Sequence, residues 1–152
     1  GAIGEEGNSL DVDTLSLAAN EFSAATGMSV REVMGDMAIA QAQSTDGVVS
    51  LVSAEGDIQL GAVSAGEAVS LTAKGSVLDA NADAVNVDSK QLSIIAENGA
   101  IGSVTDAIEL AGIDTQLTAS ASGDIALAQT ESNLILAVEN SPPACTFSVS
   151  KW

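Results

Sequence analysis

The sequence predicts an all-β fold, a β-solenoid in which each coil of backbone stacks on the previous one. Four runs of alternating apolar residues each reach a glycine, and these glycines, at 56, 75, 99 and 123, lie 19, 24 and 24 positions apart. A period in the twenties with strand-type alternation is typical of a solenoid whose neighbouring coils bury a shared core. Only three of the 152 residues are aromatic, so Val, Ile, Leu and Ala must fill the interior, which suits a narrow core.

The chain opens on an element that occurs twice. Gly1-Ala2-Ile3-Gly4 recurs as Gly99-Ala100-Ile101-Gly102, 98 positions later. A strand is expected after each copy, over residues 10–17 and 108–110. A longer repeat is therefore superposed on the coil repeat.

Residues 21–46 are the least regular part of the chain. Residues 30–42 have apolar positions near helical spacing, but Gly35-Asp36 followed by alternating apolar residues matches Gly123-Asp124 and its successors. We therefore predict strands here, with Gly-Asp forming the corner of a coil.

Residues 47–138 carry the clearest pattern, with Gly, Asn, Asp and Ser at the corners between strands. No proline occurs before position 142, as expected where nearly every backbone N–H is needed for sheet hydrogen bonds. Strands are expected at 48–53, 57–63, 68–73, 76–79, 84–87, 91–96, 108–110, 116–119, 124–128 and 133–138.

Alternation also predicts which side chains face the core. We expect Leu51, Leu71, Ile94 and Leu117 to form one vertical file, and Ser53, Thr72 and Thr118 to occupy equivalent places on successive coils. The complete set of expected inward positions is Leu51, Ile58, Leu60, Val69, Leu71, Val77, Val85, Ile94, Ile101, Leu110, Leu117, Ile125, Leu127 and Leu136.

Residues 141–152 break the pattern, because they hold both prolines, Cys145 and two of the three aromatic residues. A solenoid ends in open strand edges that need a cap or a partner. We predict one solenoid domain over residues 1–140, followed by a non-repeat cap or tail over 141–152.

Charge excludes several classes of partner. The chain has 21 acidic residues against four basic ones, a net charge of −17. Without a cationic patch it is not expected to bind nucleic acid or an anionic membrane surface. It also lacks an apolar run near the ~20 residues that span a bilayer, so no membrane insertion is expected.

Catalysis is not expected from these residues. Histidine and tyrosine are absent, which removes the commonest general base. A polysaccharide-active enzyme could pair Asp79 with Asp83 or Asp11 with Asp13, but sugar sites usually add aromatic platforms and basic side chains, which are scarce here.

Calcium is the one ligand that the spacing suggests. Asp57 and Asp124 each follow a corner glycine and could align with acids on neighbouring coils to share a hard cation. The alternative is that they are solvated acids that keep the edges soluble. No other cofactor is expected.

The repeats resemble those of a known class of proteins. Gly99-Ala100-Ile101-Gly102-Ser103, the stretch from Leu117 to Ile125, and Ser70-Leu71-Thr72-Ala73-Lys74-Gly75 are similar to the β-strand repeats of large bacterial exoproteins, the filamentous-haemagglutinin-like adhesins. The resemblance covers residues 1–138. It implies a right-handed parallel β-helix, here of about six or seven coils, exported to the cell surface or the medium.

The function expected from this resemblance is structural and adhesive. The chain would be a non-catalytic stalk or adhesin segment of a secreted bacterial surface protein, contacting host-cell, glycan or self surfaces. The alternative is a subunit that stacks end to end into an extracellular filament, with the strand near Leu134 to Val138 pairing with residues 2–12 of the next copy. A polysaccharide-active enzyme is the third possibility.

Overall fold

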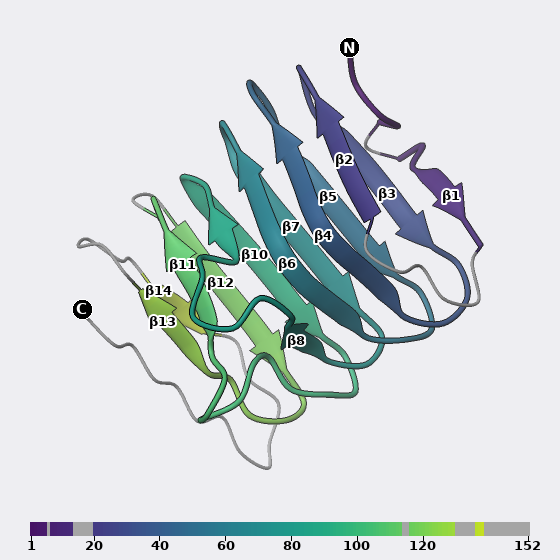
Figure 1. Ribbon diagram of the computed structural model, residues 1–152. Helices are drawn as coiled ribbons and strands as arrows, with labels where there is room; N and C mark the ends of the chain where they lie inside the picture. Colours follow the sequence, from purple (N-terminus) through teal and green to yellow (C-terminus); the bar gives the residue numbers. More distant parts are fainter. Residues whose placement is uncertain (6, 14–19, 114–115, 130–135, 139–152) are drawn as a thin grey trace.

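The chain folds into two parallel β-sheets joined by tight corners, with at least one strand of each sheet in every complete coil (Figure 1). The computed structural model describes residues 1–5, 7–13, 20–113, 116–129 and 136–138. Within these residues all pairings between the labelled strands are parallel and no helix is present. The predicted β-solenoid is confirmed, and residues 141–152 lie outside the described part.

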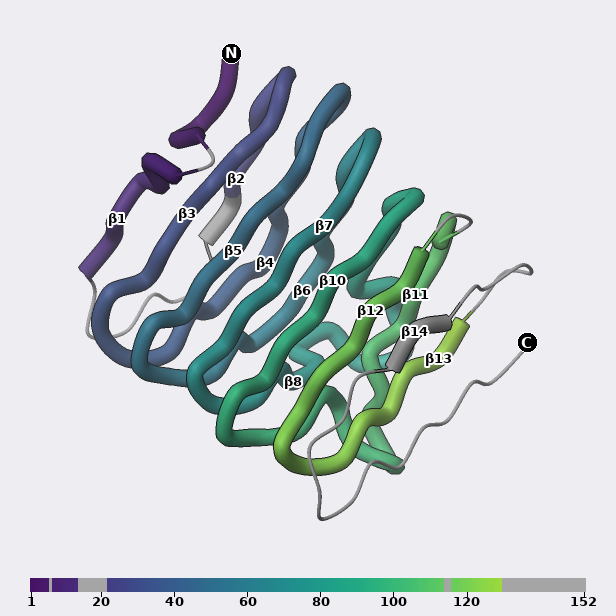
Figure 2. The backbone as a smooth tube through the Cα atoms, turned by 180° about the vertical axis from the view of Figure 1, so that it is seen from behind, coloured from purple at the N-terminus to yellow at the C-terminus, as the bar shows by residue number. Residues whose placement is uncertain are grey.

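The first sheet has the strand order β1-β3-β5-β7-β10-β12-β14 (Figure 2). The second follows the order β13-β11-β9-β6-β4-β2, with β8 also paired to β6. Five coils are complete, from β3 to β13, and β1, β2 and β14 belong to further coils at the two ends.

The bounds of the first sheet's strands are β1 Leu10–Val12, β3 Met28–Glu32, β5 Val49–Ser53, β7 Ala68–Ala73, β10 Gln91–Ala96, β12 Gln116–Ala121 and β14 Leu136–Val138. Those of the second are β2 Asn20–Ala24, β4 Met37–Ser44, β6 Ile58–Ala65, β8 Val77–Asp79, β9 Val87–Asp88, β11 Ile108–Ala111 and β13 Leu127–Gln129. The segment with near-helical spacing, 30–42, is therefore the end of β3, a corner at Gly35-Asp36 and the start of β4, as predicted.

Inward side chains stack in vertical files along the axis. The central file of the first sheet runs Val30, Leu51, Leu71, Ile94, Ala119, and each of these positions pairs with the next. A file in the second sheet runs Met37, Ile58, Val77, Ile101, Ile125. All ten side chains are buried, which gives the thin aliphatic core expected from the composition.

One detail of the predicted file is wrong. Leu117 pairs with Leu92, not with Ile94, so it belongs to the neighbouring file and Ala119 takes the predicted place. Both Leu117 and Ala119 are buried. A shift of two residues keeps every side chain on the same face, so alternation alone does not distinguish the two registers.

The other predicted core positions are buried wherever the structure describes their side chains, with a single exception. Val85 is only partly buried, and Val87 fills the core in its place, pairing with Val63 and Leu110. Val85 lies in a segment that leaves the sheet between β8 and β9. The side chain of Leu136 lies outside the described part.

The longer repeat is confirmed in the backbone. Ile3 pairs with Met28 and Leu10 with Val30, just as Ile101 pairs with Ile125 and Ile108 with Leu127. In each copy the glycine after the isoleucine has a positive φ, 63° at Gly4 and 62° at Gly102, and a short antiparallel turn follows. A Cβ at either glycine would collide with backbone, so only glycine fits.

Two segments leave the second sheet on its outer side. Residues 80–86 link β8 to β9, and residues 102–107 precede β11. Figure 1 shows the first as a teal loop beside β8. Each of these segments carries one of the acids discussed below, Asp83 in the first and Asp106 in the second.

No helix in the described residues is long and apolar enough to cross a membrane. The boundary predicted at residue 140 lies outside the described part of the chain.

Candidate functional site

The outward side chains of β5, β7, β10 and β12 form a face without charge. We name it the hydroxyl face. It consists of Ser50, Val52, Ala68, Ser70, Thr72, Gln91, Ser93, Ile95, Gln116, Thr118 and Ser120. All are at least partly exposed and none is ionisable, although the chain carries a net charge of −17.

Hydroxyl groups form a continuous column on this face. Ser29 pairs with Ser50, Ser50 with Ser70, Ser70 with Ser93, and Ser93 with Thr118. These pairings contain no register shift, so the hydroxyls repeat at the strand spacing of about 4.8 Å. A shallow hollow of about 190 Å³ runs along Ser70, Ser93 and Thr118.

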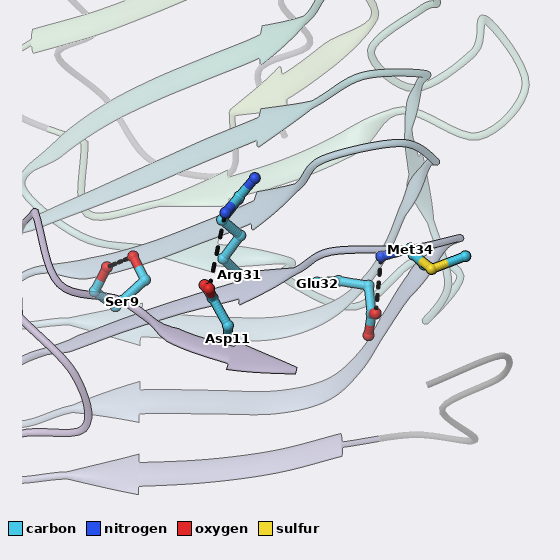
Figure 3. Close-up of polar contacts among 6 residues, drawn as sticks. Ser9, Asp11, Arg31, Glu32 and Met34 are labelled. Atoms are coloured by element: carbon cyan, nitrogen blue, oxygen red, sulfur yellow. Dashed lines mark hydrogen bonds and ion pairs between the residues drawn. The ribbon is translucent and has the colours of Figure 1, made fainter. Parts of the chain in front are cut away.

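Charge appears at the N-terminal end of this sheet (Figure 3). The Oγ atoms of Ser9 and Ser29 are 2.7 Å apart and extend the hydroxyl column to β1. Beside them, Arg31 Nη1 lies 3.8 Å from Asp11 Oδ2. Glu32 instead points inward; it is fully buried and accepts a hydrogen bond from the Met34 N–H at 3.3 Å. The uncharged face therefore begins beyond β3.

The predicted equivalence of Ser53, Thr72 and Thr118 is wrong. Thr118 lies in the hydroxyl column, whereas Thr72 lies in the adjacent column, paired with Val52 and Ile95. Ser53 faces inward at a corner, where its Oγ donates to the Gly35 carbonyl and accepts from the Gly56 N–H. Three outward columns cross these strands: one all hydroxyl, one mixed, and a third of Ala68, Gln91 and Gln116.

The predicted calcium ligand Asp57 is part of a ladder at the corner that opens the second sheet. Asp36 Oδ1 accepts from the Asp57 N–H at 2.8 Å, and Asp57 Oδ1 accepts from the Ser76 N–H at 2.6 Å. Ser76 Oγ then accepts from the Ala100 N–H at 3.1 Å. Each short side chain thus satisfies a backbone donor of the next coil.

Asp124 occupies the same corner column, but it is not brought close to Asp57. Ile101 pairs with Ile125, so the position next to Asp124 is Ala100, and the coils of Ser76 and Ala100 lie between the two aspartates. Asp57 has an acid as its neighbour, Asp36, and Asp124 has none on the preceding coil. Among the described residues, no group of three or more Cys, Asp or Glu side chains is arranged to hold a metal ion.

A second group of acids gathers on the outer side of the second sheet. We name Asp79, Asp83, Asp106 and Glu109 the carboxyl cluster. Asp79 ends β8, Asp83 lies in the segment after it, Asp106 lies in the turn before β11, and Glu109 is on β11. The predicted pair Asp79 and Asp83 belongs to this group, whereas Asp11 faces Arg31 and Asp13 is exposed.

The Asn86 side chain hydrogen-bonds to two members of the cluster, the Asp79 carboxylate and the Glu109 backbone. It is fully buried, and its Nδ2 lies 2.6 Å from Asp79 Oδ1, 2.9 Å from Asn81 Oδ1 and 2.9 Å from the Leu60 carbonyl. Its Oδ1 accepts from the Glu109 N–H at 2.8 Å. One amide therefore ties three coils together and fixes the backbone that carries Asp79 and Glu109.

The charged groups that act on Glu109 are all acidic. Glu109 is 8% exposed, and burial, followed by the charges of Asp79, Asp106 and Asp83, raises its pKa to about 7. The pKa of Asp106 is raised as well, by desolvation and then by the charge of Asp79. Asp79 Oδ2 and Glu109 Oε2 are buried and make no hydrogen bond.

Sequence reasoning found Asp79 and Asp83 but missed Asp106, Glu109 and Asn86. The length of the coil could have indicated the cluster. The spacing from Gly75 to Gly99 is 24 positions, against 19 from Gly56 to Gly75, and the longer coil includes Asp79, Asn81, Asp83 and Asn86. A coil that grows by inserting acids and asparagines places them together outside the sheet.

Three comparisons with known proteins gave no match for this chain. Neither the models of protein families, nor the curated sequences, nor the solved structures contain one that is significantly similar to it.

Proposed function

We propose that this chain is a structural, non-catalytic segment of a secreted bacterial surface protein, serving as a stalk or adhesin rod. The observation that supports it best is the unbroken backbone pairing from β3 to β12 in the first sheet. Continuous ladders of this kind make a stiff elongated unit, because every coil is fixed by its neighbours on both sides. The bacterial and extracellular parts of the proposal rest on the resemblance of the repeats to adhesin repeats.

The hydroxyl face is the contact surface in this proposal. An acidic protein is repelled by cell surfaces that are themselves polyanionic, and a face without charge allows close approach. Its Ser and Thr hydroxyls and the Gln91 and Gln116 amides can hydrogen-bond neutral glycans, while Val52 and Ile95 supply apolar contact. Many identical shallow contacts along a rod add up through multivalency.

Adhesion of beads coated with the chain tests this proposal. We expect coated beads to bind host-cell layers or immobilised neutral polysaccharides. The variant Ser70→Asp with Thr118→Asp, which places two charges on the hydroxyl face two coils apart, should reduce binding at least tenfold. Gln41→Asp with Gln59→Asp is the matched control, because both side chains are exposed on the second sheet. Absence of binding, or equal loss in both variants, would contradict the proposal.

The alternative, a subunit that stacks end to end, is favoured by one observation. Leu10 pairs with Val30 at the head of the central core file, yet its side chain is 46% exposed. A further coil placed over β1 would bury it and continue the file. This coil could belong to another copy of the chain or to the same polypeptide.

Sedimentation velocity and electron microscopy separate the two functions. A filament that shortens or disappears in Leu10→Lys supports stacking of copies. A monodisperse monomer at all concentrations excludes the filament and leaves the rod segment.

A further inference from the structure

We propose that Asn98 is a site of spontaneous chemical modification, at which the side-chain amide becomes a carboxylate after attack by the Gly99 backbone nitrogen. The modification needs water and no enzyme, and it does not depend on the function proposed above. Asn98-Gly99 is the one Asn-Gly dipeptide in the sequence. It lies in the corner that follows β10.

The first argument is the state of the Gly99 N–H, which supplies the attacking atom. The donors on either side of it are hydrogen-bonded to the preceding coil, the Asn98 N–H to the Lys74 carbonyl at 3.0 Å and the Ala100 N–H to Ser76 Oγ at 3.1 Å. Among the hydrogen bonds of the described residues, none uses the Gly99 N–H. This nitrogen can therefore lose its proton and approach the Asn98 side chain without giving up a backbone hydrogen bond.

The second argument is the freedom of the Asn98 side chain. Asn98 is exposed and Gly99 is partly exposed, so solvent reaches the dipeptide. A single described hydrogen bond holds the amide, from Nδ2 to the Lys74 carbonyl at 3.1 Å. The buried Asn86 differs, because its Nδ2 lies near four oxygen acceptors. Departure of the Asn98 Nδ2 atom thus breaks only one contact of the corner.

The third argument is that the fold requires glycine at position 99. A Cβ there would collide with Ser76 Oγ and with the backbone of Gly75 and Ser76 on the preceding coil. A side chain after the asparagine would hinder ring closure, and the packing of the coils excludes one. The reaction is confined to this corner, since the residues before the other glycines of the repeat carry no side-chain amide. These residues are Glu55, Lys74 and Ser122.

The reaction has two steps. Hydroxide removes the Gly99 amide proton, the nitrogen attacks Asn98 Cγ, and Nδ2 leaves as ammonia after taking a proton from water. The product is a five-membered succinimide ring, which one water molecule then opens. Cleavage at Cγ leaves aspartate, whereas cleavage at the main-chain carbonyl carbon leaves isoaspartate, in which the main chain runs through Cγ. In total, an amide and one water become a carboxylate and ammonium.

Both products disturb the corner. A carboxylate cannot donate to the Lys74 carbonyl, so two acceptors face each other where Nδ2 donated at 3.1 Å. The new charge also lies next in sequence to Glu97, whose partner is the Lys74 ammonium at 2.6 Å. Isoaspartate in addition lengthens the main chain by one atom beside the Gly75 and Ser76 backbone. Modification therefore weakens the stacking of the β10 coil on the β7 coil.

The test is incubation of the full chain at pH 8 and 37 °C, with samples taken over several weeks. Fragmentation mass spectrometry locates each amide that has become an acid, and isoaspartyl methyltransferase labels isoaspartate. We expect conversion at Asn98 to be at least fivefold faster than at Asn8, which is exposed and precedes a serine. Conversion should be slower at pH 6, because attack requires the deprotonated nitrogen.

Asn98→Gln is the matched variant, since it keeps an uncharged amide but would have to close a larger ring. We expect the aged wild-type chain to unfold at a lower urea concentration than the fresh one, and the aged variant to show no such shift. An Asn98 amide that persists throughout the incubation would overturn the proposal. Conversion in a synthetic peptide of residues 91–104 but not in the folded chain would overturn it as well, because the corner would then protect the dipeptide.

Discussion

The two sheets use the same alternation of side chains but present opposite surfaces. The outer face of β5, β7, β10 and β12 is uncharged and lined by hydroxyls. The second sheet carries two excursions of the chain on its outer side, and the carboxyl groups of Asp79, Asp83 and Asp106 lie near Glu109 there. The solenoid therefore has a regular side and an irregular side.

Coil length explains the difference. Along the corner column, successive hydrogen-bonded positions are 21, 19 and 24 residues apart. The first sheet nevertheless keeps complete pairing from β3 to β12, with no register shift. The additional residues are placed on the second sheet, at 80–86 and 102–107. The first sheet can thus stay periodic while the second accepts insertions. The carboxyl cluster lies at these insertions.

The largest expected effect comes from the regular side. Leu71→Ala removes a fully buried side chain from the middle of the central file, between Leu51 and Ile94. Stacked coils cannot collapse into the space, so we expect a loss of about 4 kcal/mol in the free energy of unfolding. Urea unfolding followed by circular dichroism measures it.

The outward neighbour Thr72 is the control for this substitution. Thr72→Ala should cost less than about 1 kcal/mol, because only strand propensity and surface contacts change. Equal losses in the two variants would mean that the inward and outward assignments are wrong.

This contrast also shows what the sequence could predict. Alternation identified the inward faces, so Leu51, Leu71 and Ile94 were placed in one file correctly. It failed at Leu117 and Val85, each of which lies two residues from the position that fills the predicted place. A period of two specifies the face but not which inward residue pairs with which, because corner geometry sets the register.

The carboxyl cluster could be predicted only in part for a related reason. Asp79 and Asp83 are close in sequence, whereas Glu109 joins them through the stacking of one coil on the next. Its backbone N–H is bound by Asn86, at the end of the excursion, at 2.8 Å. Residues that meet across coils through an irregular segment leave no periodic signal.

The second prediction concerns the irregular side. Asn86→Ala removes an Nδ2 group that donates to four oxygen acceptors. It also leaves the Glu109 N–H without its acceptor. We expect a loss of about 3 kcal/mol, since buried polar groups left unpaired are costly. Asn98→Ala is the control: its exposed amide donates only to the Lys74 carbonyl among the bonds described, and the loss should be under about 0.5 kcal/mol. A smaller loss at Asn86 than at Asn98 would refute its organising role.

The third prediction is the pH dependence that Glu109 imposes. Its pKa is about 7 in the folded chain, against an ordinary value of 4.5, so the folded state holds the proton more tightly. The stabilisation is complete below pH 4.5 and is lost as pH rises through 7. Between pH 4.5 and 8 we expect this group to account for a loss of about 3 kcal/mol.

Glu109→Gln shows whether this group is responsible. The variant should lose less stability than the wild-type chain over the same pH range and should be the more stable of the two at pH 8. Parallel pH profiles for the two proteins would contradict the assignment.

The smallest effect is expected on the hydroxyl face. Ser70→Ala or Ser93→Ala should change the free energy of unfolding by less than about 0.5 kcal/mol, since both side chains face outward and make no described hydrogen bond that holds a coil. A loss above 2 kcal/mol at either position, measured by urea unfolding, would mean that the column serves stability rather than contact.

The solenoid depends most directly on the register of neighbouring coils, which disulfide cross-linking measures. In a Cys145→Ser background, Thr72→Cys with Ile95→Cys places two thiols on paired positions of β7 and β10. Adjacent strands bring such Cα atoms within the range that a disulfide spans, whereas Thr72→Cys with Ser93→Cys is offset by two residues. We predict rapid, nearly complete oxidation of the 72–95 pair and little of the 72–93 pair. The reverse order would show that the coils do not stack in this register.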